Sequence, residues 1–112
     1  KSIKLHSIKI NDEEKNHLSI LRVRLEKLNN IIAKNKFTPI FITQIKFDGL
    51  SDRRMFLVNE EIKKFTRKNN YKIVPIDELI TKMSPGDFYD EVHTTISGSK
   101  KIAEIIYKNL IW

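Results

Sequence analysis

The feature that most constrains the fold is a run of apolar, mostly β-branched residues in the middle of the chain, TPIFITQI, at residues 38–45. Four apolar positions leave little alternation along it: Ile40, Phe41, Ile42 and Ile45. A strand that is covered on both faces needs such a run, and strands of this kind are typical of parallel sheets. A second strand is expected at YKIVPID, residues 71–77. The sequence therefore predicts a parallel sheet.

Segments around these strands have the apolar spacing of amphipathic helices. A long helix is expected at residues 11–35, capped by Asn11 or Asp12, and a second at 53–70. The first could also form a coiled-coil seam, but its repeat lasts only about two heptads, so a helix lying on a sheet is favoured. A short helix is expected at DELITKM, and Thr95 or Ser97 should cap the last helix. The core positions expected in the three longer helices are Leu18, Leu21, Leu25, Leu28, Ile32, Met55, Val58, Ile62, Phe65, Ile102, Ile105, Ile106 and Leu110.

The order helix, strand, helix, strand, short helix, loop, helix indicates an α/β domain with right-handed crossovers. Two parallel strands cannot bury both faces of a sheet that must support this many helices. Either residues 1–10 supply another strand, or most of the sheet lies outside the sequence. We expect the second, because the chain also begins with Lys rather than Met. Residues 1–112 are thus interpreted as a single unit, the C-terminal half of a domain.

Composition excludes some classes of site and leaves others open. The 112 residues contain no Cys, so no disulfide framework or thiolate metal site is possible. No apolar run approaches the ~18 residues of a membrane span. The net charge is +7, but the lysines are spread along the chain. The clusters Lys63-Lys64 with Arg67-Lys68, and Lys100-Lys101, fall on predicted polar helix faces, so we expect solvated surfaces there and no nucleic-acid partner.

The segment FYDEVHTTISGSKKIAEIIYKNL, residues 88–110, carries the candidate chemistry. Asp90 precedes His93 by three residues, at the start of the last predicted helix. Imidazole suits a general base because its unperturbed pKa, ~6.5, is near working pH. A carboxylate that accepts from Nδ1–H would hold the ring in one tautomer. The alternative is a turn capped by Asp90 with a partly exposed His93. A metal site that adds Asp87 lacks a further ligand.

Other polar and aromatic residues have structural interpretations. Asp77 could face a site at the end of the second strand, but is expected to cap the following helix. The residues expected at the surface are His6 and His17, and those expected to serve packing are Phe88, Tyr89 and Trp112.

The segment from Tyr89 onward resembles the last sequence block of the SGNH, or GDSL-type, hydrolases. In that block an Asp-x-x-His is followed by a Gly and an Ala, here Asp90, His93, Gly98 and Ala103. TPIFITQI resembles the family's strand after its Asn-bearing block, and residues 59–80 resemble the next helix and strand. The resemblance covers about residues 12–112.

The resemblance implies a three-layer α/β/α sandwich with a parallel, flavodoxin-like sheet. It implies a serine ester hydrolase, or a transferase to a sugar hydroxyl, that acts on a small-molecule or glycan acyl ester and needs no cofactor. His93 would be the general acid/base and Asp90 the residue that orients it. The acyl group, the compartment and the oligomeric state are not implied.

The sequence departs from the family at several points. The Gly-Asp-Ser block, the isolated Gly and the Gly-x-Asn-Asp block are absent, and Ile96-Ser97 stands where many relatives have Pro-Glu. None of the serines at 51, 84, 97 and 99 has a nucleophile-like context. The nucleophile and oxyanion donors are therefore expected in a missing N-terminal half, and the 112 residues alone are expected to be inactive. The alternatives are a non-catalytic binding or assembly module of the same fold and, more remotely, a basic module that binds nucleic acid or an anionic polymer.

Overall fold

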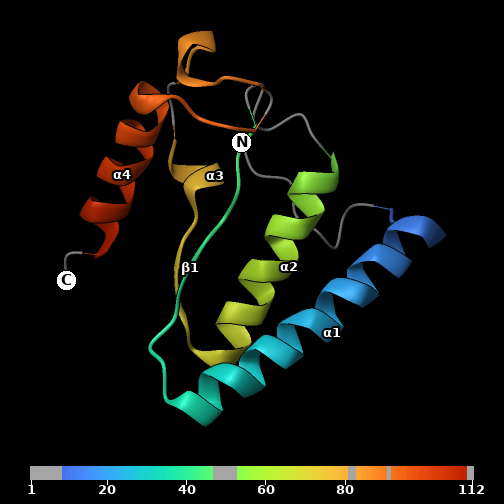
Figure 1. Cartoon of the computed structure of the whole chain (residues 1–112). Coiled ribbons are helices and arrows are strands. Elements are labelled where there is room, and N and C mark those ends of the chain that lie inside the picture. Colours follow the sequence, from blue (N-terminus) through green and yellow to red (C-terminus); the bar gives the residue numbers. More distant parts are fainter. Residues whose placement is uncertain (1–8, 47–52, 81–82, 91, 111–112) are drawn as a thin grey trace.

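The computed structural model describes residues 9–46, 53–80, 83–90 and 92–110 (Figure 1). The elements, in chain order, are α1 (Asp12–Asn35), β1 (Ile40–Ile42), α2 (Arg53–Asn69), β2 (Lys72–Val74), α3 (Ile76–Leu79), the 3-10 turn η3 (Pro85–Asp87) and α4 (Ile96–Leu110). This is the predicted order. The expectations for most of residues 1–10, including His6, for Ser51, for residues 81–82 of the short helix, and for Trp112 fall outside the described residues.

The two strands are parallel, with Ile40, Phe41 and Ile42 opposite Lys72, Ile73 and Val74. The strands lie between α2 and α4 in Figure 1, so the fold class is α/β. Both strands are shorter than predicted. Within the described residues the sheet has two strands, and this is too few for the complete three-layer sandwich.

The first helix has the predicted start, but it packs on a different surface. Asn11 caps it: its side chain accepts from the amide of Glu14, and Glu14 accepts from the amide of Asn11. Leu18, Leu25 and Ile32 are buried, at a spacing of seven. The helix that carries them lies against α2, as Figure 1 shows, and its main contacts are with α2 rather than with the strands. The expectation that this helix lies directly on the sheet was therefore wrong.

The second helix buries more than the one face predicted from its apolar spacing. Of the four expected core residues only Phe65 is fully buried, whereas Leu57, Asn59, Glu61 and Thr66 are also buried. The reason is that α1 covers one side of α2 and the sheet covers the other. Asn70, in the left-handed conformation at φ 57°, follows the last residue of α2, so the predicted end of the helix is confirmed.

The core lies between α2 and the strands. The rings of Phe41, Phe65 and Tyr71 are neighbours, with centroids 5.7–5.9 Å apart. Val74 and Ile76, at the end of β2 and the start of α3, are completely buried. The candidate site lies beyond the carboxyl ends of both strands.

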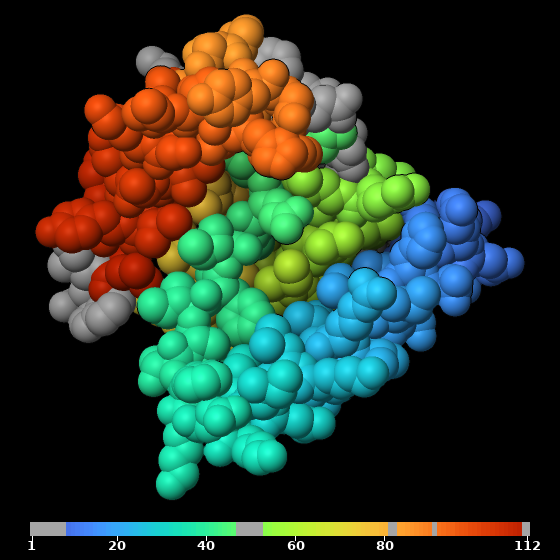
Figure 2. All heavy atoms as spheres, in the orientation of Figure 1, coloured from blue at the N-terminus to red at the C-terminus, as the bar shows by residue number. Residues whose placement is uncertain are grey.

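The side of the sheet toward α4 is less well covered. Ile40 and Ile42 keep 44% and 39% of their surface exposed. The α4 side chains expected in the core are only half-buried, namely Ile102, Ile105, Ile106 and Leu110. The space-filling view shows the β1 segment at the surface, between α4 and the α1–α2 pair (Figure 2). In the part of the chain that is described, no helix combines the length and apolarity that crossing a membrane requires.

Candidate functional site

The Asp-x-x-His segment lies at the end of the molecule toward which the strands run. In Figure 1 the chain leaves β1 upward, and the turn that follows η3 lies at that same end, where α4 begins. The carboxyl ends of parallel strands are the usual location of ligand sites in open α/β sheets. The fold therefore puts Asp90 and His93 where a site would be expected.

Backbone hydrogen bonds close this turn into a short loop. Phe88 and Thr94 form an antiparallel bridge, and the amide of Tyr89 donates to the carbonyl of His93 at 2.7 Å. One step outward, the amide of Thr95 donates to the carbonyl of Asp87 at 2.9 Å. The loop thus has a paired stem, and Asp90 lies within the loop that this stem closes.

Asp90 and His93 are in direct contact. His93 Nδ1 lies 2.8 Å from Oδ2 and 3.0 Å from Oδ1 of Asp90. Asp90 Oδ1 also accepts from the amides of Val92, at 2.9 Å, and of His93, at 2.8 Å. Asp90 therefore caps the turn and holds the imidazole at the same time, so the turn interpretation and the orienting interpretation describe one geometry.

The protonation state of the carboxyl group determines the tautomer of the ring. The amide of Val92, the ring of His93 and the amide of His93 lower the pKa of Asp90 from 3.8 to about 2. Near neutral pH the carboxylate is therefore ionised and can only accept hydrogen bonds. The proton of neutral His93 must then be on Nδ1, and Nε2, on the other side of the ring, carries the free lone pair that a general base needs.

The pair is open to solvent. The side chain of His93 is 73% exposed. The described serines of this region are all bonded elsewhere: Ser84 and Ser97 to Asp87, and Ser99 to Thr94. None of these three hydroxyls therefore pairs with His93 in this structure.

Exposed apolar side chains flank the pair. Tyr89, Val92 and Ile96 are all exposed, whereas Phe88 is buried. The expectation that Tyr89 serves packing was wrong, because the alternation of the short stem turns it away from the side on which Phe88 is buried. His17, by contrast, is exposed on α1 as predicted.

The glycine of the sequence block has a steric role. Gly98 lies in the first turn of α4, where Thr95 caps the helix by accepting from the Gly98 amide at 3.4 Å. A Cβ atom built on Gly98 would lie 2.2 Å from the carbonyl oxygen of Asp87. Only glycine lets the helix approach the stem of the loop this closely. Gly98 thus belongs to the structure that holds the turn.

Two of the lysines expected on solvated helix faces have internal partners instead. Lys63, with 11% of its side chain exposed, contacts Glu60, Asp77 and Glu78 at 2.5–2.8 Å. Burial by itself lowers the pKa of Lys63, but the hydrogen bonds to Asp77, Glu60 and Glu78 outweigh it and raise the pKa above its usual value. Lys101 binds Asp87. The sequence interpretation failed here because the buried carboxylates that these lysines contact, Asp77 and Asp87, are 14 residues distant in the chain.

Asp77 has a role that differs from the predicted cap. Its carboxylate accepts from Thr43 Oγ1 at 2.7 Å and from Lys63 at 2.8 Å, while Pro75 occupies the cap position of α3. Asp77 therefore joins the ends of both strands to α2. The carboxylates of Glu60, Asp77 and Glu78 are close enough together to bind a metal ion, but the ammonium of Lys63 contacts all three. The positive charge that such a cluster needs is thus supplied by the chain itself.

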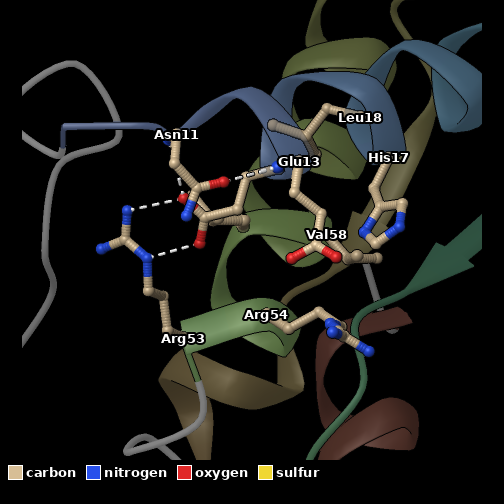
Figure 3. Close-up of a pocket in the computed structure, with 9 residues that line it drawn as sticks. Asn11, Glu13, His17, Leu18, Arg53, Arg54 and Val58 are labelled. Carbon is tan, nitrogen blue, oxygen red and sulfur yellow. Dashed lines mark hydrogen bonds and ion pairs between the residues drawn. The ribbon is translucent and has the colours of Figure 1, made fainter.

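A cavity of about 220 Å³ lies elsewhere, between the first turns of α1 and α2 (Figure 3). It is lined by Asn11, Glu13, Glu14, His17, Leu18, Arg53, Arg54, Leu57 and Val58. Arg53 closes one side of it through a two-bond pair with Glu14, at 2.6 and 3.0 Å. Neither Asp90 nor His93 lines this cavity, so the candidate chemistry and the cavity are separate features.

Comparison of the chain with protein-family models, with curated proteins and with solved structures finds no match. The features that bear on function are therefore the geometry of the turn and the sequence block that it contains.

Proposed function

We propose that this chain is the C-terminal half of an SGNH-type serine ester hydrolase, in which His93 is the general acid/base and Asp90 orients it. The observation that supports the proposal is the contact between an ionised Asp90 carboxylate and Nδ1 of His93. That contact leaves Nε2 free on an exposed ring at the carboxyl end of the strands. A base of a Ser-His-Asp arrangement needs this orientation.

The reaction would proceed in two acyl transfers. First, a serine hydroxyl outside this chain gives its proton to Nε2 of His93 while its oxygen bonds to the carbonyl carbon of the ester. The alcohol then leaves with that proton. In the second transfer water gives a proton to Nε2 and attacks the acyl-serine, so that the acid is released and the serine is restored. Asp90 stabilises the imidazolium in both transfers.

The complete domain would be a three-layer α/β/α sandwich, with further strands supplied by the N-terminal half. Two observations support this part of the proposal. Among the described residues β1 has a strand neighbour on one side only, and a bare strand edge is a place for another strand to pair. Ile40 and Ile42 on β1 are also more exposed than is usual for residues of a buried parallel strand.

The test is labelling of the full-length protein with a fluorophosphonate probe, which reacts with activated serines. Wild type is compared with His93→Ala and Asp90→Asn, and with His17→Ala as the control, because His17 is an exposed histidine on a different helix. We expect labelling of the wild type and of the control. Labelling should be lost in His93→Ala and reduced by about 10⁴-fold in Asp90→Asn, by analogy with the loss of the orienting carboxylate in serine proteases.

A folded wild-type protein that is not labelled would refute the proposal and favour the non-catalytic binding module. Labelling that persists in His93→Ala would show that the base is another residue.

A further inference from the structure

Asp87 is a buried carboxylate that the proposed reaction does not use. Only 1% of its surface is exposed, yet it lies three residues before Asp90 in a part of the molecule with few buried side chains. Burying a carboxylate is costly unless it is paired and hydrogen-bonded. Its partners therefore indicate what it contributes.

Within the described residues, the Asp87 carboxylate bonds to segments that flank the loop. Oδ1 accepts from the hydroxyl of Ser97 at 2.6 Å. Oδ2 accepts from the ammonium of Lys101 at 2.5 Å and, on the other side, from the amide and hydroxyl of Ser84 at 2.9 and 3.2 Å. The carboxylate thus joins the chain before the loop to the first two turns of α4, after it.

The backbone of Asp87 strengthens the same junction. Its carbonyl accepts from the amide of Thr95, which caps α4, and Gly98 lies against it without space for a side chain. Thr95 Oγ1 also donates to the carbonyl of Gly86 at 2.8 Å. The two ends of the loop that carries Asp90 and His93 are therefore held by one buried residue and its immediate neighbours.

We infer that Asp87 is a positioning residue, whose buried bonds to Ser97 and Lys101 fix the loop so that the His93 ring stays on the Asp90 carboxylate and Nε2 keeps one direction. The inference rests on the proposed function for its catalytic consequence. The hydrogen bonds of Lys101, Ser97 and Ser84 hold the pKa of Asp87 well below its usual range, so the Asp87 carboxylate keeps its negative charge at any pH at which His93 could act as a base.

We call the bonds of Asp87 to Ser84, Ser97 and Lys101 the Asp87 clamp. The loop needs this clamp because the Asp90–His93 pair is exposed. An exposed pair of this kind is weak by itself, since water competes for both partners. Its geometry must then be imposed by the backbone on which it sits. A displacement of about 1 Å at a reacting group can cost on the order of 10²-fold in rate.

The experiment compares four variants of the full-length protein. Asp87→Asn removes the charge, Ser97→Ala and Lys101→Met each remove one partner, and Lys100→Met is the matched control, because Lys100 is the exposed neighbour of Lys101. Three measurements are made on each: the rate of fluorophosphonate labelling, the ¹⁵N chemical shifts of the His93 ring, and the urea midpoint of unfolding. The ring shifts report the tautomer directly, and this signature does not respond to a loss of stability alone.

We expect Asp87→Asn and Lys101→Met to slow labelling by about 10- to 100-fold and to reduce the Nδ1–H tautomer of His93, with Lys100→Met within about twofold of wild type. A variant that combines Asp87→Asn with Lys101→Met should be no slower than Asp87→Asn alone, because both changes act on the same Asp87–Lys101 bond. If Asp87→Asn does not fold, Ser97→Ala, which removes one hydroxyl, gives the decisive result.

Folded variants with wild-type ring shifts and wild-type labelling would overturn the inference. If wild type is not labelled, the proposed function fails, but the ring shifts still test the clamp: an unchanged tautomer in Asp87→Asn refutes it, and a changed one supports it.

Discussion

The N-terminal part of this chain, from α1 to β2, and its C-terminal part, from η3 to α4, are stabilised by different kinds of contact. From α1 to β2 an apolar core, which includes Leu18, Leu25, Ile32, Leu57 and Phe65, is buried between helices and strands, together with the hydrogen-bonded Asn59 and Glu61. From η3 to α4 the buried residues are few, and the segments are joined by the carboxylate of Asp87, by backbone hydrogen bonds and by the close approach at Gly98.

The difference matters for function. Apolar burial is not directional, so it makes a region stable without fixing any one side chain to a fraction of an ångström. Hydrogen bonds to a buried carboxylate are short and directional. A site that must hold one ring nitrogen toward a reacting group is better supported by the second kind of contact, whereas the helices behind it need only the first.

The largest loss of stability should come from Phe65→Ala, in the apolar core between α1 and β2. Phe65 is buried and touches Phe41 and Tyr71, so truncation leaves a cavity beside these two rings. We expect a loss of about 3–5 kcal/mol in the free energy of unfolding, measured by urea denaturation. Phe37→Ala is the control, because Phe37 is 60% exposed. Equal losses in the two variants would show that the region is not packed as described.

A somewhat smaller loss should follow Lys63→Met, which removes the cation that joins α2 to the carboxylates of α3. The carboxylates of Asp77, Glu60 and Glu78 would be left together without their cation. We expect a loss of about 2–4 kcal/mol at neutral pH, below the full value for a buried pair because Glu78 is half exposed. The measurement is the urea denaturation of Lys63→Met, and Lys64→Met, a change at an exposed lysine, is the control.

An unchanged stability of Lys63→Met would show that the three carboxylates do not depend on Lys63. A loss that disappears when the medium is acidified would instead support the electrostatic explanation, since protonated carboxyl groups no longer repel one another.

In the C-terminal part, from η3 to α4, Gly98→Ala should separate α4 from the stem of the loop that carries Asp90. The added Cβ would lie 2.2 Å from the backbone oxygen of Asp87, and backbone atoms cannot move aside cheaply. Overpacking of this kind costs about 1–3 kcal/mol, and this exceeds the gain of up to about 1 kcal/mol that alanine brings to a helix. Amide hydrogen exchange of α4 measures the effect. Gly86→Ala, where a Cβ meets nothing within 4 Å, is the control, and equal exchange in both variants would contradict the steric argument.

The smallest change in stability is expected from protonation of Asp90 in acid. Because its folded-state pKa, about 2, lies below the unfolded value of 3.8, its contribution to stability is present above about pH 3.8 and is lost as the pH falls through about 2. The amide signals of Val92 and His93 should follow this titration in NMR spectra recorded between about pH 5 and about pH 1.5, and Asp90→Asn should abolish it. Amides that titrate near 3.8 would mean that the carboxylate does not cap the turn.

The sequence could predict those features that depend on neighbours along the chain. The cap at Asn11, the end of α2 at Asn69 and the Asp90–His93 contact all involve residues at most four apart, and each was expected. The roles of Lys63, Asp77 and Asp87 could not be found in this way. Their roles depend on partners that are 14 to 34 residues distant. A lysine on a helix has the same local pattern whether its partner is water or a buried carboxylate.

The sequence by itself determined the α/β class, the order of the elements and the spacing that brings Asp90 to His93, because helix period, strand period and turn geometry are local properties of the chain. The tertiary structure decided which faces are covered: α1 lies on α2, α2 is buried on two sides, and Lys63 and Lys101 point inward. Burial depends on what packs against a face, and that is settled only when distant segments meet. The same reason explains why the clamp at Asp87 was visible only in the fold.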